Sequence, residues 1–193
     1  MASPRAYLDL TVAEWLDALA ASRGAPGGGS MLGIAVATAA AVLAMAARVS
    51  EDGGLAAQAD ALRARSAPLA QRDADTYDAA LAVRDATEAL RSDRRDWAIG
   101  QAFARAAEPP LEIARVAADI AGLAEAIAAG GHPRVRADVV AAAALAAGAA
   151  RGAVALVTVN LTVVDGDPRV ADVERFARDA EHAFARIGQG TAG

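Results

Sequence analysis

The sequence contains no cysteine and no lysine, and only 4% of its residues are aromatic. Without cysteine the chain can form no disulfide, no thiol nucleophile and no cysteine-ligated zinc site. Without lysine it cannot form a catalytic Schiff base, attach PLP or build a Walker-type phosphate loop, because each of these needs a lysine. These absences exclude several enzyme classes before any motif is considered.

The residues that are present predict one globular, all-α domain. Of the 193 residues, 58 are alanine, 55% are hydrophobic and 22% are charged, which is typical of a folded soluble chain. Abundant alanine with few aromatics favours helices that pack closely on small side chains over a β-sheet. The formal net charge of −5 argues against a nucleic-acid partner, because binding phosphates requires a basic surface.

Two long apolar segments raise the question of a membrane. Residues 31–47 carry no charge, and residues 139–164 carry only that of Arg151. Both consist mainly of alanine, which enters lipid only weakly, so we predict central helices of a bundle and no membrane partner. Helices that are apolar on every face need neighbours all round, and this surplus of apolar surface predicts a homodimer.

The organisation of the chain predicts a single domain over residues 1–193. No linker or repeat divides it, and residues 188–193 are expected to form a frayed tail. Asp9, Glu14 and Asp17 interrupt the apolar core that a secretory signal requires, so we expect a cytoplasmic protein.

Helix signals in the first half of the chain are clear. Thr11 and Glu14 form a capping box that predicts a helix over 11–22. Ser30, after a run of glycines, is predicted to cap a second helix that continues to residues 50–52. Residues 55–90 have helical spacing, with Pro68 either kinking one long helix or marking the start of another.

The second half predicts three or four further helices, giving a bundle of about six or seven. One starts near Ser92 and breaks or kinks at Pro109 and Pro110, after which helical spacing resumes to residue 129. Asp138 is predicted to cap the next helix, which runs to residue 164. The β-branched run 154–164 alternatively predicts a strand, but a lone strand would lack a partner for its backbone groups. A final amphipathic helix is predicted over 169–187.

The segment Pro26, Gly27, Gly28, Gly29 and Ser30 is the sharpest local signal for a binding site. Three glycines leave no side chains between the backbone amides and a ligand. The segment opens onto a helix N-terminus, where unpaired amides and the helix dipole favour an anion or a polarised carbonyl. The alternative is a flexible connection that ends in a serine cap.

A second candidate cluster lies at the entrance of the helix predicted from Asp138. His132, Arg134 and Arg136 precede that carboxylate, so two guanidiniums, an imidazole and a carboxylate are predicted to converge there. Such a group would hold an anionic substrate and act on a cationic centre. The alternative is that Asp138 only caps the helix and the arginines are solvated.

Two other features carry polar groups, an amide in an apolar helix and an acidic patch. Asn160 is the one amide side chain in an apolar helix, where a buried polar group needs a partner or a ligand. Asp73, Asp75 and Asp78, with the neighbouring tyrosine, form an acidic patch that we interpret as a solvated helix face. No histidine or cysteine stands at ligand spacing from this patch, so no metal is expected.

Taken together, these residues resemble the cyclodeaminase/cyclohydrolase family, the folate-processing domain found alone or fused in formiminotransferase-cyclodeaminase. Six blocks carry the resemblance in collinear order, at residues 11–17, 25–30, 73–79, 106–114, 131–138 and 159–161. They include the Pro-Gly-Gly-Gly-Ser segment, the Asp-Ala-x-x-Tyr block, the Pro-Leu-Glu block and the Val-Asn-Leu ending. The similarity covers nearly the whole chain.

The resemblance implies an up-and-down helical bundle that forms a homodimer and binds a tetrahydrofolate derivative as its substrate near the glycine segment. Family members close 5-formimino-tetrahydrofolate with loss of ammonia or hydrolyse 5,10-methenyl-tetrahydrofolate to the 10-formyl form. Both reactions pass through a tetrahedral carbon beside a cationic amidine, which a carboxylate can stabilise. The alternative is a diverged, non-catalytic dimer that binds a folate-like ligand.

The resemblance also assigns roles to particular residues. Asp138 is predicted to be the catalytic carboxylate, and His132 offers a group that titrates near neutral pH. The residues predicted to bind substrate are Pro26, Gly27, Gly28, Gly29, Ser30, Arg84, Arg134 and Asn160. The sequence departs from the family pattern in three places: His132, Arg134 and Ala137 replace polar residues of the family's loop, Arg84 is the nearest basic residue where the family has lysine, and Leu156 stands where the family has asparagine.

Overall fold

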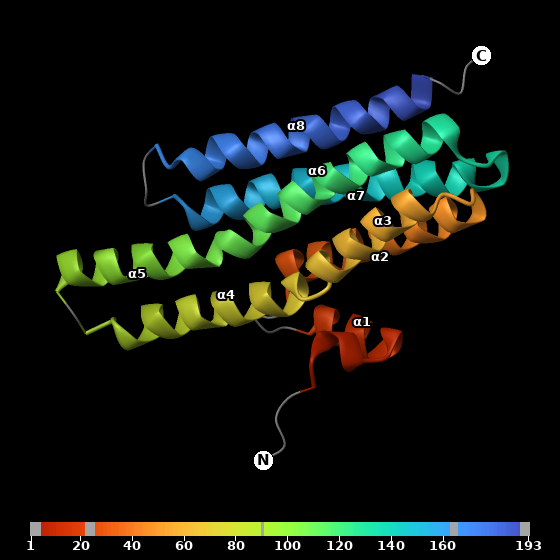
Figure 1. Ribbon diagram of the computed structural model, residues 1–193. Helices are drawn as coiled ribbons and strands as arrows, with labels where there is room; N and C mark the ends of the chain where they lie inside the picture. Colours follow the sequence, from red (N-terminus) through yellow and green to blue (C-terminus); the bar gives the residue numbers. More distant parts are fainter. Residues whose placement is uncertain (1–4, 22–25, 90, 163–165, 190–193) are drawn as a thin grey trace.

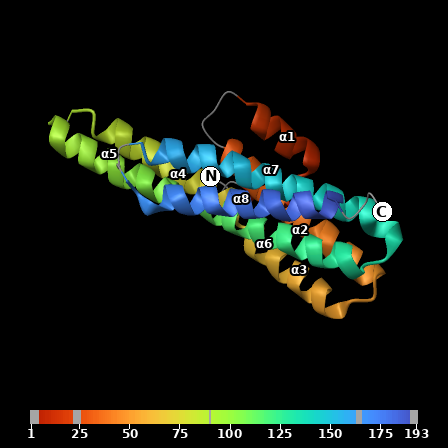
Figure 2. The ribbon, with the colours of Figure 1, turned by 90° about the horizontal axis from the view of Figure 1, so that it is seen from above.

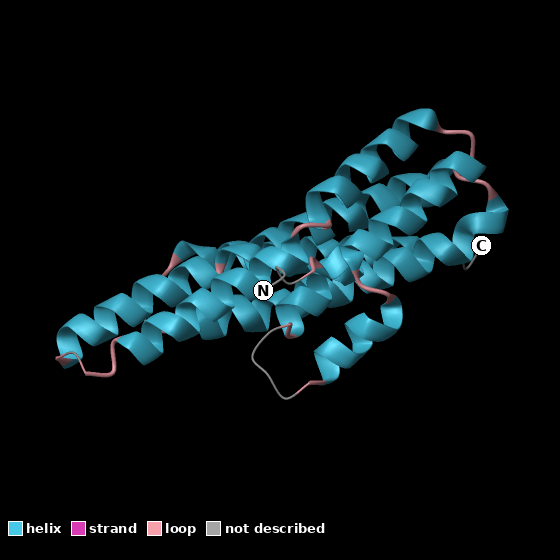
Figure 3. Ribbon diagram, turned by 90° about the horizontal axis from the view of Figure 1, so that it is seen from below, coloured by secondary structure: helices cyan, strands magenta, loops and turns pink. Residues whose placement is uncertain are grey.

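The described residues of the computed structural model, 5–21, 26–89, 91–162 and 166–189, are helical with no strand among them (Figures 1 and 3). The α-helices are α1 Val12–Ala20, α2 Gly28–Val49, α3 Gly53–Ser66, α4 Leu69–Ala86, α5 Ser92–Ala106, α6 Glu108–Gly130, α7 Arg136–Asn160 and α8 Pro168–Gln189. Short 3-10 helices cover Tyr7–Asp9 and Pro133–Val135. The predicted all-α bundle is confirmed.

The long helices α2, α6, α7 and α8 form the body of the bundle. Helix α6 packs against α7 and α8, and α2 packs against α3 and α7. Helices α4 and α5 form a hairpin that projects from one end, and α1 stands apart on the α2 side (Figures 1 and 2). No residue of α1 is buried, although its capping box is present as predicted. Helix α1 therefore contributes no residue to the buried core.

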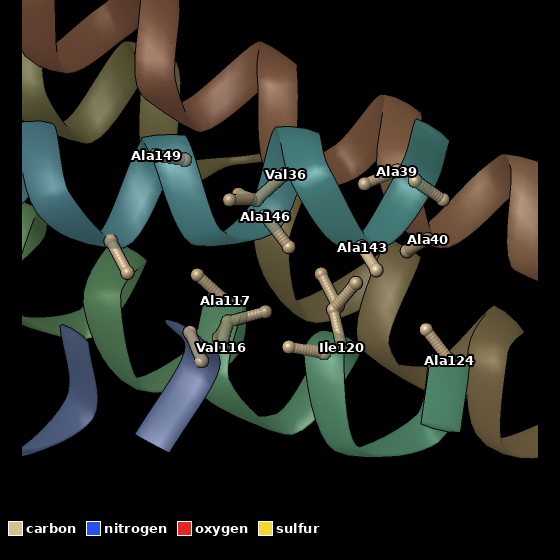
Figure 4. Packing of buried hydrophobic residues seen from close by; sticks show 14 of the residues in the cluster. Val36, Ala39, Ala40, Val116, Ala117, Ile120, Ala124, Ala143, Ala146 and Ala149 are labelled. Atoms are coloured by element: carbon tan, nitrogen blue, oxygen red, sulfur yellow. The ribbon is translucent and has the colours of Figure 1, made fainter. Parts of the chain in front are cut away.

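The core depends on alanine and glycine at the helix contacts. Val36 and Ala40 of α2 lie opposite Ala143 of α7 and Ile120 of α6, and all four are fully buried (Figure 4). At Gly33 an added Cβ would lie 2.6 Å from the backbone nitrogen of Ala70 in α4. Small side chains thus allow the backbones to approach closely, as the composition predicted.

The structure shows whether the helices are kinked or divided at Pro68 and at Pro109 and Pro110. The segment 55–90 forms two helices, because α3 ends at Ser66 and Pro68 is the N-cap of α4. Pro109 and Pro110 lie in the first turn of α6, where a missing amide costs no helical hydrogen bond. The β-branched run is helical as far as Asn160, while residues 163–165 lie outside the described residues.

Three boundary predictions are wrong. Ser30 does not cap α2, because the N-cap is Gly27 and the helix starts one residue later. Asp138 does not cap α7 either, because the N-cap is Val135 and Asp138 lies in the first turn. Helix α8 continues through residues 188–189, which were expected to be frayed, and residues 190–193 lie outside the described residues.

Helix α2 and the segment Pro133–Asn160 are long and apolar enough to cross a membrane by length and composition. In the bundle, 56% and 44% of their most apolar windows are buried. The core helix of a soluble protein meets the same criterion, so this feature by itself is weak evidence for a membrane span.

Candidate active site

The glycine segment opens a cavity of about 200 Å³ at the N-terminus of α2. It is lined by Gly27, Gly28, Gly29, Asp73, Ala74, Tyr77, Leu156, Val159 and Asn160. These residues come from three helices, α2, α4 and α7, that are distant in sequence. Among the described residues that line the cavity, Asp73 is the one charged side chain.

The start of α2 fits against a carboxylate. A Cβ placed on Gly29 would lie 2.0 Å from Oδ1 of Asp73, so only glycine leaves room for that side chain. Ser30 is fully buried, and its hydroxyl donates a hydrogen bond of 3.2 Å to Oδ2 of Asp73. Gly29 is therefore required for this close approach, and Ser30 joins α2 to α4 where a cap was predicted.

The Asp73 carboxyl is the electrostatic centre of the cavity. Burial raises its pKa, while hydrogen bonds from the hydroxyl and the backbone amide of Ser30 act in the opposite direction. The carboxyl lies beside the first turn of α2, whose amides lack intrahelical acceptors. The cavity thus holds a desolvated acid next to the positive end of a helix dipole.

Asn160 contributes a second acceptor from the last turn of α7. Its side chain is 8% exposed, and its Nδ2 donates a hydrogen bond of 3.1 Å to the backbone oxygen of Ala106. Its Oδ1 accepts no hydrogen bond from any described residue. Anchoring of Nδ2 therefore fixes the orientation of the amide and leaves Oδ1 as the group available to a ligand.

Tyr77 completes the polar lining from α4. Its ring makes an edge contact with Phe103 of α5, with the two centroids 6.2 Å apart. The ring is held by this aromatic contact one turn beyond Asp73. The apolar part of the lining includes Leu156 and Val159 of α7.

The predicted catalytic loop lies at the other end of the bundle. Twenty-two residues of α7 separate Asp138 from Asn160, which at 1.5 Å per residue is roughly 33 Å. The His132 backbone N–H donates to Oγ of Ser50, at 2.8 Å, beyond the C-terminal end of α2. Within one chain, Asp138 and His132 do not reach the glycine segment.

The side chains of this loop are exposed. Nδ1 of His132 accepts a hydrogen bond of 3.1 Å from the backbone N–H of Arg134, which orders the short turn before α7. Asp138 is also exposed. His132 and Arg134 precede α7 and Asp138 lies in its first turn, and among the described residues no hydrogen bond or ion pair joins Asp138 to either of them, so their convergence stays a prediction.

Of the other predicted binding residues, Pro26 lies next to the glycine cavity and Arg84 lies away from it. Pro26 is buried next to the glycines, although it does not line the cavity. Arg84 is exposed, pairs with its neighbour Asp85 at 3.0 Å and does not line the cavity. It lies seven residues beyond Tyr77, or about 10 Å along α4.

Sequence reasoning missed Asp73, which it placed on a solvated face. The acidic spacing concealed its role, because Asp75 and Asp78 nearby are indeed exposed. The signal that points to Asp73 is its position at the head of one of the six blocks that resemble the family. The described residues contain no cluster of three or more potential metal ligands, and the expectation of no metal stays a prediction.

Comparisons with known proteins identify the family and the fold. A family model described as formiminotransferase-cyclodeaminase matches residues 11–179. The chain belongs to this family. A crystal structure of formiminotetrahydrofolate cyclodeaminase from Thermotoga maritima has the same fold, with a TM-score of 0.83 and 20% sequence identity. The match covers 94% of this chain and 96% of that one. No curated protein sequence matches the chain.

Proposed function

We propose that the chain is a folate one-carbon enzyme that hydrolyses 5,10-methenyl-tetrahydrofolate or cyclises 5-formimino-tetrahydrofolate with loss of ammonia. One observation carries the proposal: Gly27, Gly28 and Gly29 lie in the same cavity as Asn160, although the two segments are distant in sequence. The family resemblance implies that folate binds near the glycine segment, and Asn160 is predicted to bind substrate as a buried amide in an apolar helix. Membership of a folate-processing family supports the same substrate class.

The cavity in one chain suits only part of such a substrate. Its volume of about 200 Å³ is below the 300 to 1,000 Å³ that is typical of pockets for drug-sized ligands. A folate bound there would leave its one-carbon unit and its tail near the cavity mouth. Groups that act on the one-carbon unit must then approach from outside the cavity.

A second copy of the chain would supply those groups in an antiparallel dimer. If α7 of one protomer lies antiparallel to α7 of its partner, the Asp138 end of one meets the Asn160 end of the other. His132, Arg134 and Asp138 would then face the glycine cavity across the interface. Asp138 would stabilise the cationic carbon, and His132 would transfer the proton that the tetrahedral intermediate requires.

The exposed apolar face of α2 and α7 supports this dimer. Large apolar side chains remain exposed on it, namely Met31, Met45, Val49, Leu145 and Val159. Between Asp138 and Arg151, α7 carries no charge over three turns. An uncharged strip of this kind on a soluble helix indicates an interface.

Absorbance of methenyl-tetrahydrofolate in the near ultraviolet tests the activity. The protein should consume this compound or form it from the formimino substrate above the buffer rate. No rate with either substrate, together with folinate binding in calorimetry, would instead identify a diverged binding protein. Leu156, which replaces a family asparagine in the cavity wall, is the feature that favours this second candidate.

Sedimentation equilibrium at micromolar concentration tests the dimer. The parent should sediment as a dimer, and Leu145→Arg should sediment as a monomer because it places a charge in the middle of the proposed contact. Ala171→Arg adds the same charge on the exposed side of α8 and should stay dimeric. A monomeric parent would contradict the proposal. A soluble, cytoplasmic protein without a membrane or nucleic-acid partner is the expectation that accompanies it.

A further inference from the structure

The polar groups of the glycine cavity form a pattern that selects its ligand. The Asp73 carboxylate and Oδ1 of Asn160 are acceptors, while the amides of the first turn of α2 are donors. No basic side chain is among the described residues that line the cavity. A ligand that satisfies both sets must present N–H donors beside a carbonyl acceptor.

We propose that this cavity recognises the 2-amino-4-oxopyrimidine edge of a pteridine ring through Asp73. The carboxylate would accept hydrogen bonds from the ring N3–H and the 2-amino group, and the α2 amides would donate to the 4-oxo oxygen. The proposal builds on the folate function and identifies which end of the substrate enters the cavity. It makes Asp73 a binding residue and leaves the one-carbon unit to groups outside.

The placement of Asp73 argues against other ligands. The N-terminus of a helix alone would attract a phosphate or a carboxylate. Here a carboxylate lies against that N-terminus, so close to Gly29 that no Cβ would fit between them. An anion would meet this charge in a partly desolvated site, whereas a neutral ring with two adjacent donors would relieve its desolvation.

The environment of Asp73 supports the same reading. The hydroxyl of Ser30 donates to Oδ2 and its backbone amide also bonds the carboxyl, but a carboxylate has about four acceptor sites, so lone pairs remain for a ligand. Burial limits the access of water to the Asp73 carboxyl group, so each hydrogen bond from a ligand should contribute more to the binding affinity than it would at the surface. The gain should be largest for a ligand that offers two donors in one plane.

Calorimetry with pterin and lumazine tests this recognition on the full-length protein. Lumazine carries an oxygen in place of the 2-amino group, so its affinity should be about tenfold or more below that of pterin. Asp73→Asn should weaken pterin binding by about tenfold or more, because an amide cannot accept from both donors. Asp78→Asn removes an exposed carboxylate from the same helix and should bind pterin like the parent.

Two further measurements separate a binding role from a structural one. Pterin affinity should fall as the pH is lowered through the raised pKa of Asp73, because the carboxylate must be ionised to accept both bonds, and Asp73→Asn should lose this dependence. The variant should melt at or above the temperature of the parent at neutral pH, since it removes a partly buried charge. Normal melting with lost binding assigns Asp73 to the ligand.

Two results would overturn the proposal, namely equal affinity for pterin and lumazine, and parent-like pterin binding by Asp73→Asn. If that variant binds pterin like the parent but loses turnover, Asp73 is a group that acts on the reacting carbon. Failure of the folate function gives a different result, with pterin bound in an Asp73-dependent manner but neither folate converted.

Discussion

The two ends of α2 and α7 differ in how their polar groups are held. At the glycine end, Asp73, Ser30 and Asn160 are buried or partly buried, and each has a hydrogen-bond partner. At the loop end, His132 and Asp138 are exposed and close no cavity with the glycine segment. The comparison teaches that packing within one chain fixes the polar groups of the glycine end, while the loop end presents His132 and Asp138 to solvent.

The largest effect is expected at Gly29. Gly29→Val should abolish pterin binding and turnover, because its Cβ would collide with the Asp73 carboxyl group, which would have to leave the cavity. Gly28→Val is the matched comparison: Gly28 also lines the cavity, but its Cβ would lie 3.9 Å from its nearest neighbour, Cδ2 of Leu156, so this variant should weaken pterin binding less. Calorimetry on both variants checks this. Equal loss in both would mean that the glycine run serves backbone freedom and not the fit to Asp73.

The next prediction tests whether Asp138 of one protomer acts at the glycine cavity of its partner. Asp138→Asn should lower turnover by about 100-fold, as loss of a transition-state charge partner does. When it is mixed with Gly29→Val and the subunits exchange, one site in each hybrid dimer is free of both changes. Random pairing should then restore about a quarter of the parent activity, because half of the dimers are hybrid and each has one intact site. No recovery after verified exchange would place the two residues in separate functions.

Alanine substitutions at two glycines inside the helices should change the free energy of unfolding by smaller amounts and in opposite directions. Gly33→Ala should lower the free energy of unfolding by about 1–3 kcal/mol, because its Cβ would lie 2.6 Å from the backbone of Ala70. Gly122→Ala in α6 meets nothing within 4 Å and should raise that free energy by up to about 1 kcal/mol through helix propensity. Denaturant titration of both variants measures the difference. Equal signs would refute the close contact of α2 with α4.

These comparisons show which parts of the molecule its sequence predicts. Helix identity follows from spacing and from strong signals such as Thr11 with Glu14, so the all-α fold was predictable. The start of α2 was not, because Ser30 is as good a cap by sequence as Gly27, and only the packing of Asp73 shows that the hydroxyl is used elsewhere. A tertiary contact, which local sequence preference does not reveal, therefore distinguishes the two possible starts of α2.

The sequence likewise predicted some residues of the candidate site and missed one of them. Gly27, Gly28, Gly29 and Asn160 stand out because their residue types are unusual for their surroundings. Asp73 does not, since an acid on a polar helix face is ordinary, and its partial burial depends on the absence of a side chain at Gly29. The relation between two residues distant in the sequence carries the information, and neither position shows it alone.

The smallest effect is expected on the stability of the loop end. Asp138→Asn should change the free energy of unfolding by about 0.5 kcal/mol or less, because Asp138 is exposed in the first turn of α7 and loses only its interaction with the helix dipole. Had it been the cap, an asparagine would also have preserved it, so Asp138→Ala distinguishes the two situations. Loss of a true cap costs about 1 kcal/mol, whereas this variant should melt close to the asparagine variant. A clearly larger loss with alanine than with asparagine would return Asp138 to a structural role and weaken the case that the carboxylate is kept for a neighbouring subunit.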